Sequence, residues 1–286
     1  MRQAEFERIH SSEEQGSSHE RFLALARSRF GRDLVGLGDA SSSIEEFGRG
    51  IQALPQTDGV EPRQVFHLGL AGAGRVLLLP GLHGSAATFV GLANHIANSM
   101  TIVGWEHLGL DESRGRPKRI EDMASRILER EREHGLREGE PLVVFGFCIG
   151  GILGHAILEQ CAGRPGRLVV LDGHPAESIR TIGRLRRALG TVKALRKAGH
   201  GGRVEQRLVR IGLDRFRAMG LHRTGSIEHE IVLYRSGARL GFGPLDAATW
   251  SDHASSVQQV DLPDLGHTDV FRHGLEARIT RFLQAA

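Results

Sequence analysis

Short apolar runs and amphipathic stretches alternate along this chain from residue 63 onward. The apolar runs have the length of buried strands and lie at 64–70, 75–79, 101–105, 142–145, 167–171, 230–235 and 257–262. The amphipathic stretches between them predict helices at 85–98, 120–133, 149–161 and 270–283. This alternation predicts an α/β fold, in which helices cover both faces of a mostly parallel central sheet.

One segment, about residues 176–225, interrupts the alternation with two or three amphipathic helices joined at glycines. An insertion of this kind, after the sixth strand, predicts a helical lid. The segment carries thirteen Lys and Arg residues against three Asp and Glu residues. Two interpretations of this charge are open: a surface that steers an acidic partner, or solvated helix faces in which arginine serves as a helix former.

The first 60 residues are rich in Ser, Glu, Gly and Arg and contain one clear amphipathic piece, at 19–30. Residues 29–54 resemble the second half of a carrier protein, but the serines at 41–43 lack the Gly-Asp-Ser context of that family. We therefore expect a polar leader or linker at 1–60, with a carrier-protein remnant as the alternative. The main domain is expected at 61–286.

Composition narrows the classes of protein that this chain can represent. A length of 286 residues suffices for one large α/β core. No apolar run approaches the roughly 18 residues that span a bilayer, and the polar, acidic N-terminus is unlike a signal peptide. Two cysteines make no disulfide framework, which favours the cytoplasm. The net charge of +3 does not point to nucleic acid.

Residues 141–151, PLVVFGFCIGG, carry the strongest chemical signal. An apolar run ends at Gly146, and Cys148 lies in the middle of the pentapeptide GFCIG. This is the spacing of the nucleophile elbow G-x-S-x-G, with cysteine in place of serine. The flanking glycines of such a turn let strand and helix approach closely, and the helix N-terminus favours a thiolate or an oxyanion. The alternative is a structural cysteine in an ordinary strand–helix turn.

A cysteine nucleophile needs a base, and the base needs an acid that orients it. In α/β-hydrolase folds these residues follow the chain order nucleophile, acid, histidine. Of the 15 histidines, His267 fits this order, because it lies after the last predicted strand and before the final helix. Two acids fit: Asp172 ends the strand after the elbow unit, and Asp246 follows the next strand. His83 and His174 also lie near strand ends and are candidates to line the pocket.

Acyl transfer also requires an oxyanion hole made of two backbone N–H groups. The residue after the nucleophile, Ile149, is expected to supply one of them. The glycine-rich loop PGLHG, after the apolar run at 75–79, is expected to supply the other through the amide of Leu82.

In order, the motifs LLLPGLHGSAATFVGLANHI, GFCIGG, VVLDG and TWSDHASSVQQVDLPDLGHTDVF resemble those of thioesterase domains that end nonribosomal peptide and polyketide assembly lines. The resemblance spans about residues 65–285 and implies an α/β-hydrolase fold. It places the family's nucleophile, histidine, acid and two oxyanion amides at Cys148, His267, Asp172, Leu82 and Ile149. Most members use serine; cysteine occurs in a minority, which includes members specialised for strained four-membered rings.

The resemblance implies a thioesterase that releases an acyl or peptidyl chain from the phosphopantetheine thioester of a carrier protein, through an acyl-enzyme on Cys148. Because transfer between two thiols preserves the thioester, a cysteine keeps the chain activated and favours cyclisation to a lactam or lactone over hydrolysis. The alternatives are an editing thioesterase or small-molecule esterase that only hydrolyses, and a non-catalytic binding protein. We expect a carrier protein as partner, with no metal, cofactor, nucleic acid or membrane.

Overall fold

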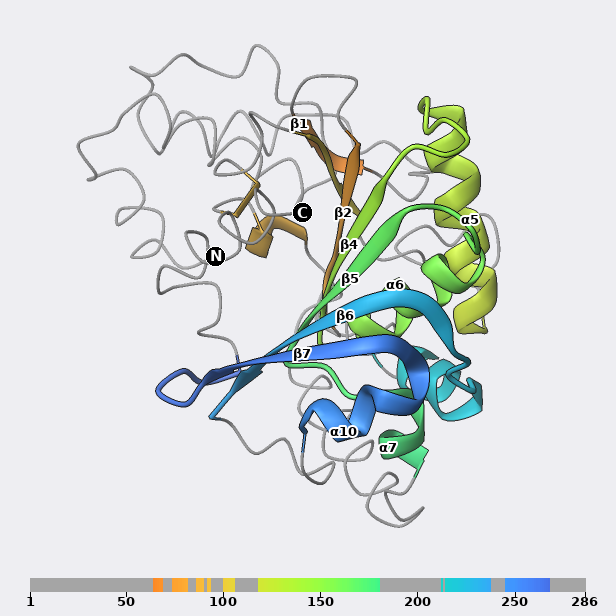
Figure 1. Ribbon diagram of the computed structural model, residues 1–286. Helices are drawn as coiled ribbons and strands as arrows, with labels where there is room; N and C mark the ends of the chain where they lie inside the picture. Colours follow the sequence, from red (N-terminus) through yellow and green to blue (C-terminus); the bar gives the residue numbers. More distant parts are fainter. Residues whose placement is uncertain are drawn as a thin grey trace, which may run out of the picture.

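The computed structural model describes residues 64–68, 74–81, 86–89, 92–93, 100–105, 118–180, 212, 214–237 and 245–267, and the structural statements below concern these residues. They contain a seven-stranded sheet with the order β1-β3-β2-β4-β5-β6-β7 (Figure 1). Its strands are β1 Gln64–Leu68, β2 Arg75–Leu79, β3 Thr101–Trp105, β4 Leu142–Phe147, β5 Gly166–Leu171, β6 Ile227–Ser236 and β7 Ala254–Leu262. The labelled helices are α5 Ile120–Glu133, α6 Ile149–Glu159, α7 Ala176–Arg180 and α10 Ala247–Trp250, with the 3₁₀ helices η1 Ala86–Phe89 and η2 Ser251–His253. Residues 214–221 are also helical.

The sheet is mostly parallel, as the alternation of strands and helices predicts. Only the β1–β3 pair is antiparallel among the described strands, and every other neighbouring pair is parallel. Parallel neighbours direct their carboxyl ends to the same edge of the sheet. The residues that follow β4, β5 and β7 are therefore brought toward one another.

The inner strands are buried on both faces, which explains why they appear in the sequence as continuous apolar runs. Successive side chains of a strand point to opposite faces. In β2, Leu77 and Leu79 belong to the core beside α5 and α6, whereas Val76 and Leu78 belong to the core beside η1. Figure 1 shows α5 and α6 on one side of the sheet.

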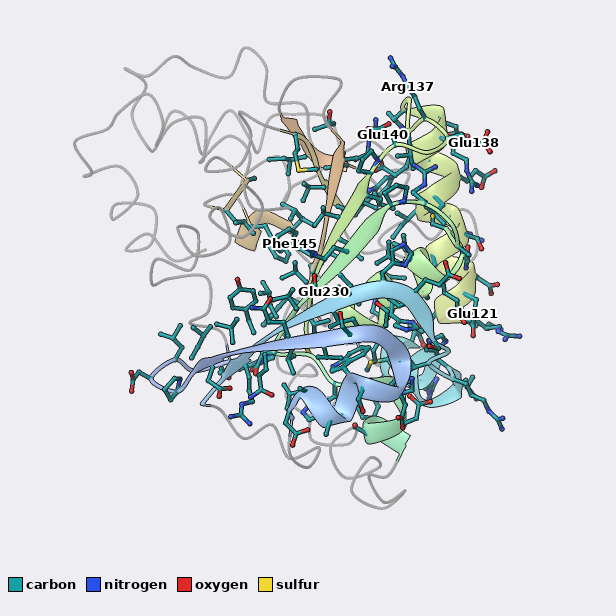
Figure 2. The ribbon with its side chains drawn as sticks, viewed as in Figure 1. Glu121, Arg137, Glu138, Glu140, Phe145 and Glu230 are labelled. Carbon is teal, nitrogen blue, oxygen red and sulfur yellow. The ribbon has the colours of Figure 1, made fainter. Side chains whose placement is uncertain are left out.

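Helix α5 buries a carboxylate as well as its apolar stripe. The side chain of Glu131 is fully buried, and its two oxygens accept hydrogen bonds from Arg75 Nη1 at 2.5 Å and Trp105 Nε1 at 2.6 Å. These bonds offset the cost of burying the charge and attach α5 to β2 and β3. Figure 2 shows the charged side chains of Arg137 and Glu138 pointing outward from the turn that follows α5.

The two ends of the predicted lid lie side by side. The amide of Ala176, at the start of α7, donates to Thr224 Oγ1 at 3.2 Å, and the amide of Thr224 donates to Glu177 Oε1 at 3.1 Å. The segment follows β5, the fifth strand of the described chain. Residues 181–211, which include most of its arginines, lie outside the described residues, so the lid stays a prediction.

Several element bounds differ from those predicted. The helix expected at 85–98 begins as the 3₁₀ helix η1, with residues 92–93 helical and the rest of that range outside the described residues. Strand β7 starts at Ala254, earlier than expected, because it lies at the end of the strand order and its first residues are half-buried or exposed, so they form no apolar run in the sequence. The predicted leader at 1–60 and the final helix at 270–283 are not described. Within the described ranges, no helix has the length and apolar character that crossing a membrane requires.

Candidate active site

Cys148 occupies the turn between β4 and α6 in a strained backbone conformation, with φ 54° and ψ −116°. Its amide donates to the carbonyl of Leu171 in β5 at 2.9 Å, and its carbonyl accepts from the amide of Gly151 at 3.1 Å. The side chain is partly exposed. This turn has the geometry expected of a nucleophile elbow, with the thiol at the carboxyl edge of the sheet and at the N-terminus of α6.

The glycines around the cysteine are required by close backbone contacts. A Cβ at Gly146 would lie 2.3 Å from the carbonyl carbon of Gly150, and a Cβ at Gly150 would lie 2.3 Å from the carbonyl oxygen of Leu79. Both distances are far below van der Waals contact. Strand β4 and helix α6 can therefore meet at the elbow only where side chains are absent, as the glycine spacing predicts.

His267 and Asp172 meet beside this elbow. Asp172 follows β5, has a φ of 51° and is almost completely buried. His267 follows β7, and its Nδ1 donates to Asp172 Oδ2 at 2.5 Å. The ring of Phe147, the residue before the cysteine, lies 4.7 Å from the His267 ring, centroid to centroid. Three sequence-distant segments thus bring the predicted nucleophile, base and acid to one edge of the sheet.

The hydrogen bonds within this group determine its charges. Burial acts to lower the pKa of His267, but hydrogen bonds with Asp172 and Cys148 outweigh it and raise the pKa to about 9. Burial acts to raise the pKa of Asp172, but hydrogen bonds from His267 and Ser236 bring it below its usual value. At neutral pH the two side chains therefore form an imidazolium–carboxylate pair.

Asp246, the alternative acid, has a different local role. Its Oδ1 accepts a hydrogen bond from the amide of Thr249 at 3.0 Å and from Thr249 Oγ1 at 2.8 Å. The amide of Asp246 in turn donates to Thr249 Oγ1, which completes a capping box at the start of α10. The geometry therefore pairs His267 with Asp172 and assigns Asp246 to helix capping.

The other predicted site residues are only partly described. Ile149 begins α6, so its N–H belongs to the first helical turn, where amides have no acceptor within the helix. His174 is buried two residues after Asp172, and burial lowers its pKa. Leu82 and His83 lie outside the described residues, so their positions stay predictions.

Two residues of the site were missed by sequence reasoning. Phe147 packs against the His267 ring, and Ser236 hydrogen-bonds to Asp172. Phe147 has only a weak sequence signal, because almost any residue fits between the glycine and the cysteine of the motif G-x-C. Ser236 has no sequence signal, because a serine at the end of a strand is common in any fold.

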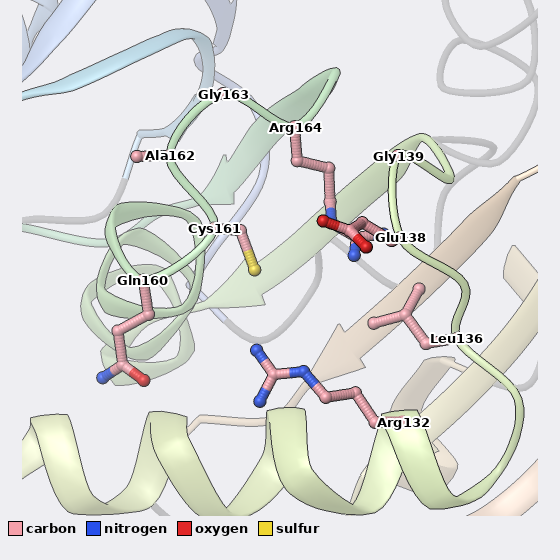
Figure 3. A pocket seen from close by; sticks show the side chains of 9 residues that line it. All are labelled: Arg132, Leu136, Glu138, Gly139, Gln160, Cys161, Ala162, Gly163 and Arg164. Atoms are coloured by element: carbon pink, nitrogen blue, oxygen red, sulfur yellow. The ribbon is translucent and has the colours of Figure 1, made fainter.

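A cavity of about 530 Å³ lies at the other edge of the sheet, among residues that precede β4 and β5. Figure 3 shows the Cys161 sulfur pointing into it toward the Arg132 guanidinium. Burial raises the pKa of the Cys161 thiol, so this second cysteine is poorly suited to nucleophilic chemistry. No cluster of His, Cys, Asp and Glu suited to a metal ion occurs in the described part of the chain.

We expect Cys148→Ala to lower the pKa of His267 from its value of about 9, because both effects of Cys148 on that histidine raise it. In the wild type, protonated His267 stabilises the folded state fully below its ordinary pKa of 6.5, and this contribution is lost as the pH rises through about 9. The Cys148→Ala variant should lose this stabilisation at a lower pH than the wild type. An NMR titration of the His267 ring protons measures the shift, and an unchanged pKa would show that Cys148 does not interact with His267.

The comparisons with known proteins agree with this architecture. The sequence model of the family described as "Thioesterase domain" matches residues 75–285. A search of curated proteins finds no match. Among solved structures, the NocB thioesterase domain in covalent complex with a fluorophosphonate nocardicin G analogue is 19% identical with a TM-score of 0.58, and the alignment covers 77% of this chain and 97% of that one.

Two further structures show the same fold. The RedJ thioesterase of the prodiginine biosynthetic pathway in Streptomyces coelicolor is 16% identical, with a TM-score of 0.56 and coverage of 81% of this chain and 96% of that one. AB3403, a four-domain nonribosomal peptide synthetase bound to AMP and glycine, is 17% identical with a TM-score of 0.63. That alignment covers 91% of this chain but 23% of the synthetase. The chain belongs to the thioesterase domain family and has the α/β-hydrolase fold.

Proposed function

We propose that this chain takes an acyl or peptidyl group from the phosphopantetheine thioester of a carrier protein onto Cys148, and then releases it by cyclisation or hydrolysis. One observation carries the proposal: a cysteine in the strained elbow turn lies beside a histidine that is hydrogen-bonded to a buried aspartate. Membership of the thioesterase domain family supports the reaction class.

The three side chains have complementary roles in this reaction. The Cys148 thiolate, which lies beside the His267 imidazolium, attacks the thioester carbon. The bond to the pantetheine sulfur breaks, and protonated His267 supplies the proton to that leaving thiol. Neutral His267 then takes a proton from an incoming amine, hydroxyl or water, which attacks the acyl-enzyme and releases the Cys148 sulfur. Asp172 keeps His267 Nδ1 protonated and stabilises the imidazolium in both steps.

Two amides are proposed to stabilise the tetrahedral oxyanion. The N–H of Ile149 lies in the first turn of α6, next to the nucleophile. The loop after β2 supports the second donor, since a Cβ built at Gly81 would lie 2.7 Å from Phe147 Cδ1 and 3.4 Å from Cys148 Cβ. The chain therefore runs against the elbow immediately before Leu82, whose amide we propose as the second donor.

The cysteine favours cyclisation over hydrolysis. Transfer from pantetheine to Cys148 exchanges one thioester for another, whereas transfer to serine would give a more stable oxoester. The acyl group on cysteine therefore stays activated toward a weak internal amine or hydroxyl, as formation of a strained lactam or lactone requires.

The charge of this chain and its structural similarity to a nonribosomal peptide synthetase both support a carrier protein as the proposed partner. The segment at 176–225 is strongly basic, and a basic surface steers acidic partners such as carrier proteins. The fold similarity to a four-domain nonribosomal peptide synthetase is consistent with such a partner. Both cysteines are free, which suits a reducing cytoplasm, and the proposed chemistry needs no metal or cofactor.

The test uses the wild type and Cys148→Ser with one pantetheine thioester whose acyl chain carries an internal amine. We expect intact mass spectrometry to show an acyl adduct that maps to Cys148, and product analysis to show ring formation. The serine variant should still be acylated, because His267 can deprotonate serine during attack, but its less activated oxoester should stall or give linear acid.

Each of the other outcomes would indicate a different function for this protein. Linear acid from both forms at similar rates would indicate an editing thioesterase or esterase that only hydrolyses. A wild type that forms no adduct, and whose Cys148 reacts slowly with iodoacetamide, would indicate a non-catalytic binding protein.

A further inference from the structure

Ser236, the last residue of β6, binds both oxygens of the Asp172 carboxylate. Its hydroxyl donates to Oδ2 at 2.7 Å, and its backbone amide donates to Oδ1 at 3.0 Å. Both residues are buried, with exposed fractions of 6% for Ser236 and 1% for Asp172. Hydrogen bonds to a charged acceptor are strong where water is excluded.

This contact arises where the β5–β6 ladder ends. Leu171 pairs with Tyr234, and the amide of Asp172 donates to the carbonyl of Tyr234 at 2.8 Å. The left-handed conformation of Asp172, with φ 51°, then turns its backbone out of the strand direction. The Asp172 side chain accepts from the Ser236 amide, so the carboxylate takes the place of a ladder carbonyl.

Gly237, the residue after Ser236, hydrogen-bonds to the segment that precedes His267. The amide of Gly237 donates to the carbonyls of Leu262 and Leu265, at 3.1 Å and 3.0 Å. A Cβ built at Gly237 would lie 2.0 Å from the carbonyl oxygen of Pro263, so the two segments are in close contact. The end of β6 therefore contacts both the acid and the turn that precedes the base.

We infer that Ser236 is a positioning residue of the active site, whose hydroxyl fixes the rotation of the Asp172 carboxylate so that Oδ2 faces His267 Nδ1. Oδ2 accepts two hydrogen bonds, from Ser236 Oγ at 2.7 Å and from His267 Nδ1 at 2.5 Å. Without the hydroxyl, Oδ1 keeps the amide bond but Oδ2 loses its contact with β6, so only the bond with His267 itself opposes rotation of the carboxylate. The inference rests on the proposed role of Cys148 as nucleophile.

The test compares Ser236→Ala with Ser236→Thr, which keeps the hydroxyl, and with Ser251→Ala as a control. Ser251 is exposed, and its hydroxyl bonds only to the nearby carbonyl of Ala248 among the described contacts. Two readouts are followed against pH: kcat and KM for a pantetheine thioester, and the rate at which iodoacetamide alkylates Cys148, located by peptide mass. The second readout requires no turnover.

We expect Ser236→Ala to lower kcat about tenfold with little change in KM, the size expected for loss of one hydrogen bond to a charged group. The lower limb of both pH profiles should move to higher pH, because the hydroxyl lowers the Asp172 pKa and its removal raises it. Among the described residues, His267 and His174 are titratable groups whose charges act near this carboxylate, and each should be followed by NMR. Ser236→Thr should restore both readouts, and Ser251→Ala should match the wild type.

A folded Ser236→Ala variant with wild-type kcat and unmoved pH limbs would overturn the inference. If that variant does not fold, Ser236→Cys keeps nearly the same volume with a weaker donor, and it should change both readouts in the same direction by less. If the wild type did not turn over the thioester, but Ser236→Ala still shifted the lower pH limb of Cys148 alkylation, the proposed function would be rejected and the role of Ser236 would stand. Normal turnover in the wild type, with neither pH limb shifted by Ser236→Ala, would keep the proposed function and reject the role of Ser236.

Discussion

Cys148→Ala is expected to abolish turnover of a pantetheine thioester, with a loss of about 10⁶-fold, while the protein stays folded. Without the sulfur no covalent intermediate can form, and the remaining groups only bind and polarise the substrate. The fold should persist because the elbow depends on the close contacts at Gly146 and Gly150, and alanine keeps the same Cβ in the same strained conformation. Initial rates and thermal unfolding monitored by circular dichroism measure the two effects separately.

Cys161→Ala is the matched control, because it removes the other thiol of the chain. Cys161 lines the cavity at the opposite edge of the sheet, where burial raises its pKa. Its loss should change the rate less than about twofold, although a buried cysteine replaced by alanine costs some stability. If Cys148→Ala kept more than a tenth of the wild-type activity, Cys148 would be excluded as the nucleophile.

The sheet and the elbow could be predicted from sequence because each leaves a local signal. Strands buried on both faces appear as apolar runs, and the contacts at Gly146 and Gly150 exclude every larger side chain, so both glycines are visible in the motif. Chain order identifies His267, because it follows the last strand of the parallel sheet and therefore lies at the edge where β4 ends. These features depend on neighbours in the sequence or on topology, both of which a single sequence carries.

The partners of these residues could not be predicted in the same way. Asp172 and Asp246 both follow apolar strands in the sequence. Only the fold shows that Asp246 hydrogen-bonds to Thr249 and caps the start of α10. The contact of Ser236 with Asp172 joins residues 64 positions apart through the end of a strand ladder. The buried Glu131 likewise appears in the sequence as one more charged residue of a helix, and its partners Arg75 and Trp105 come from two strands.

Asp172→Asn is expected to lower kcat by about 10⁴-fold, the size seen when a triad carboxylate becomes an amide. A neutral amide cannot stabilise the imidazolium, and it can present an NH₂ group to His267 Nδ1 in place of an acceptor. The pKa of His267 should fall from about 9, since its hydrogen bond with Asp172 and the carboxylate charge both raise it. Steady-state kinetics and an NMR titration of His267 in the same variant measure the two effects.

Asp246→Asn is the matched control for this variant, because asparagine is as good an N-cap residue as aspartate. Its carboxamide oxygen can still accept from the Thr249 amide, so α10 should begin at the same place. We expect its kcat within about twofold of the wild type and an unchanged His267 titration. The opposite pattern, with Asp246→Asn inactive and Asp172→Asn active, would assign the role of acid to Asp246. Because both substitutions replace one carboxylate by an isosteric amide, a difference of several orders of magnitude between them can come only from the carboxylate that meets His267.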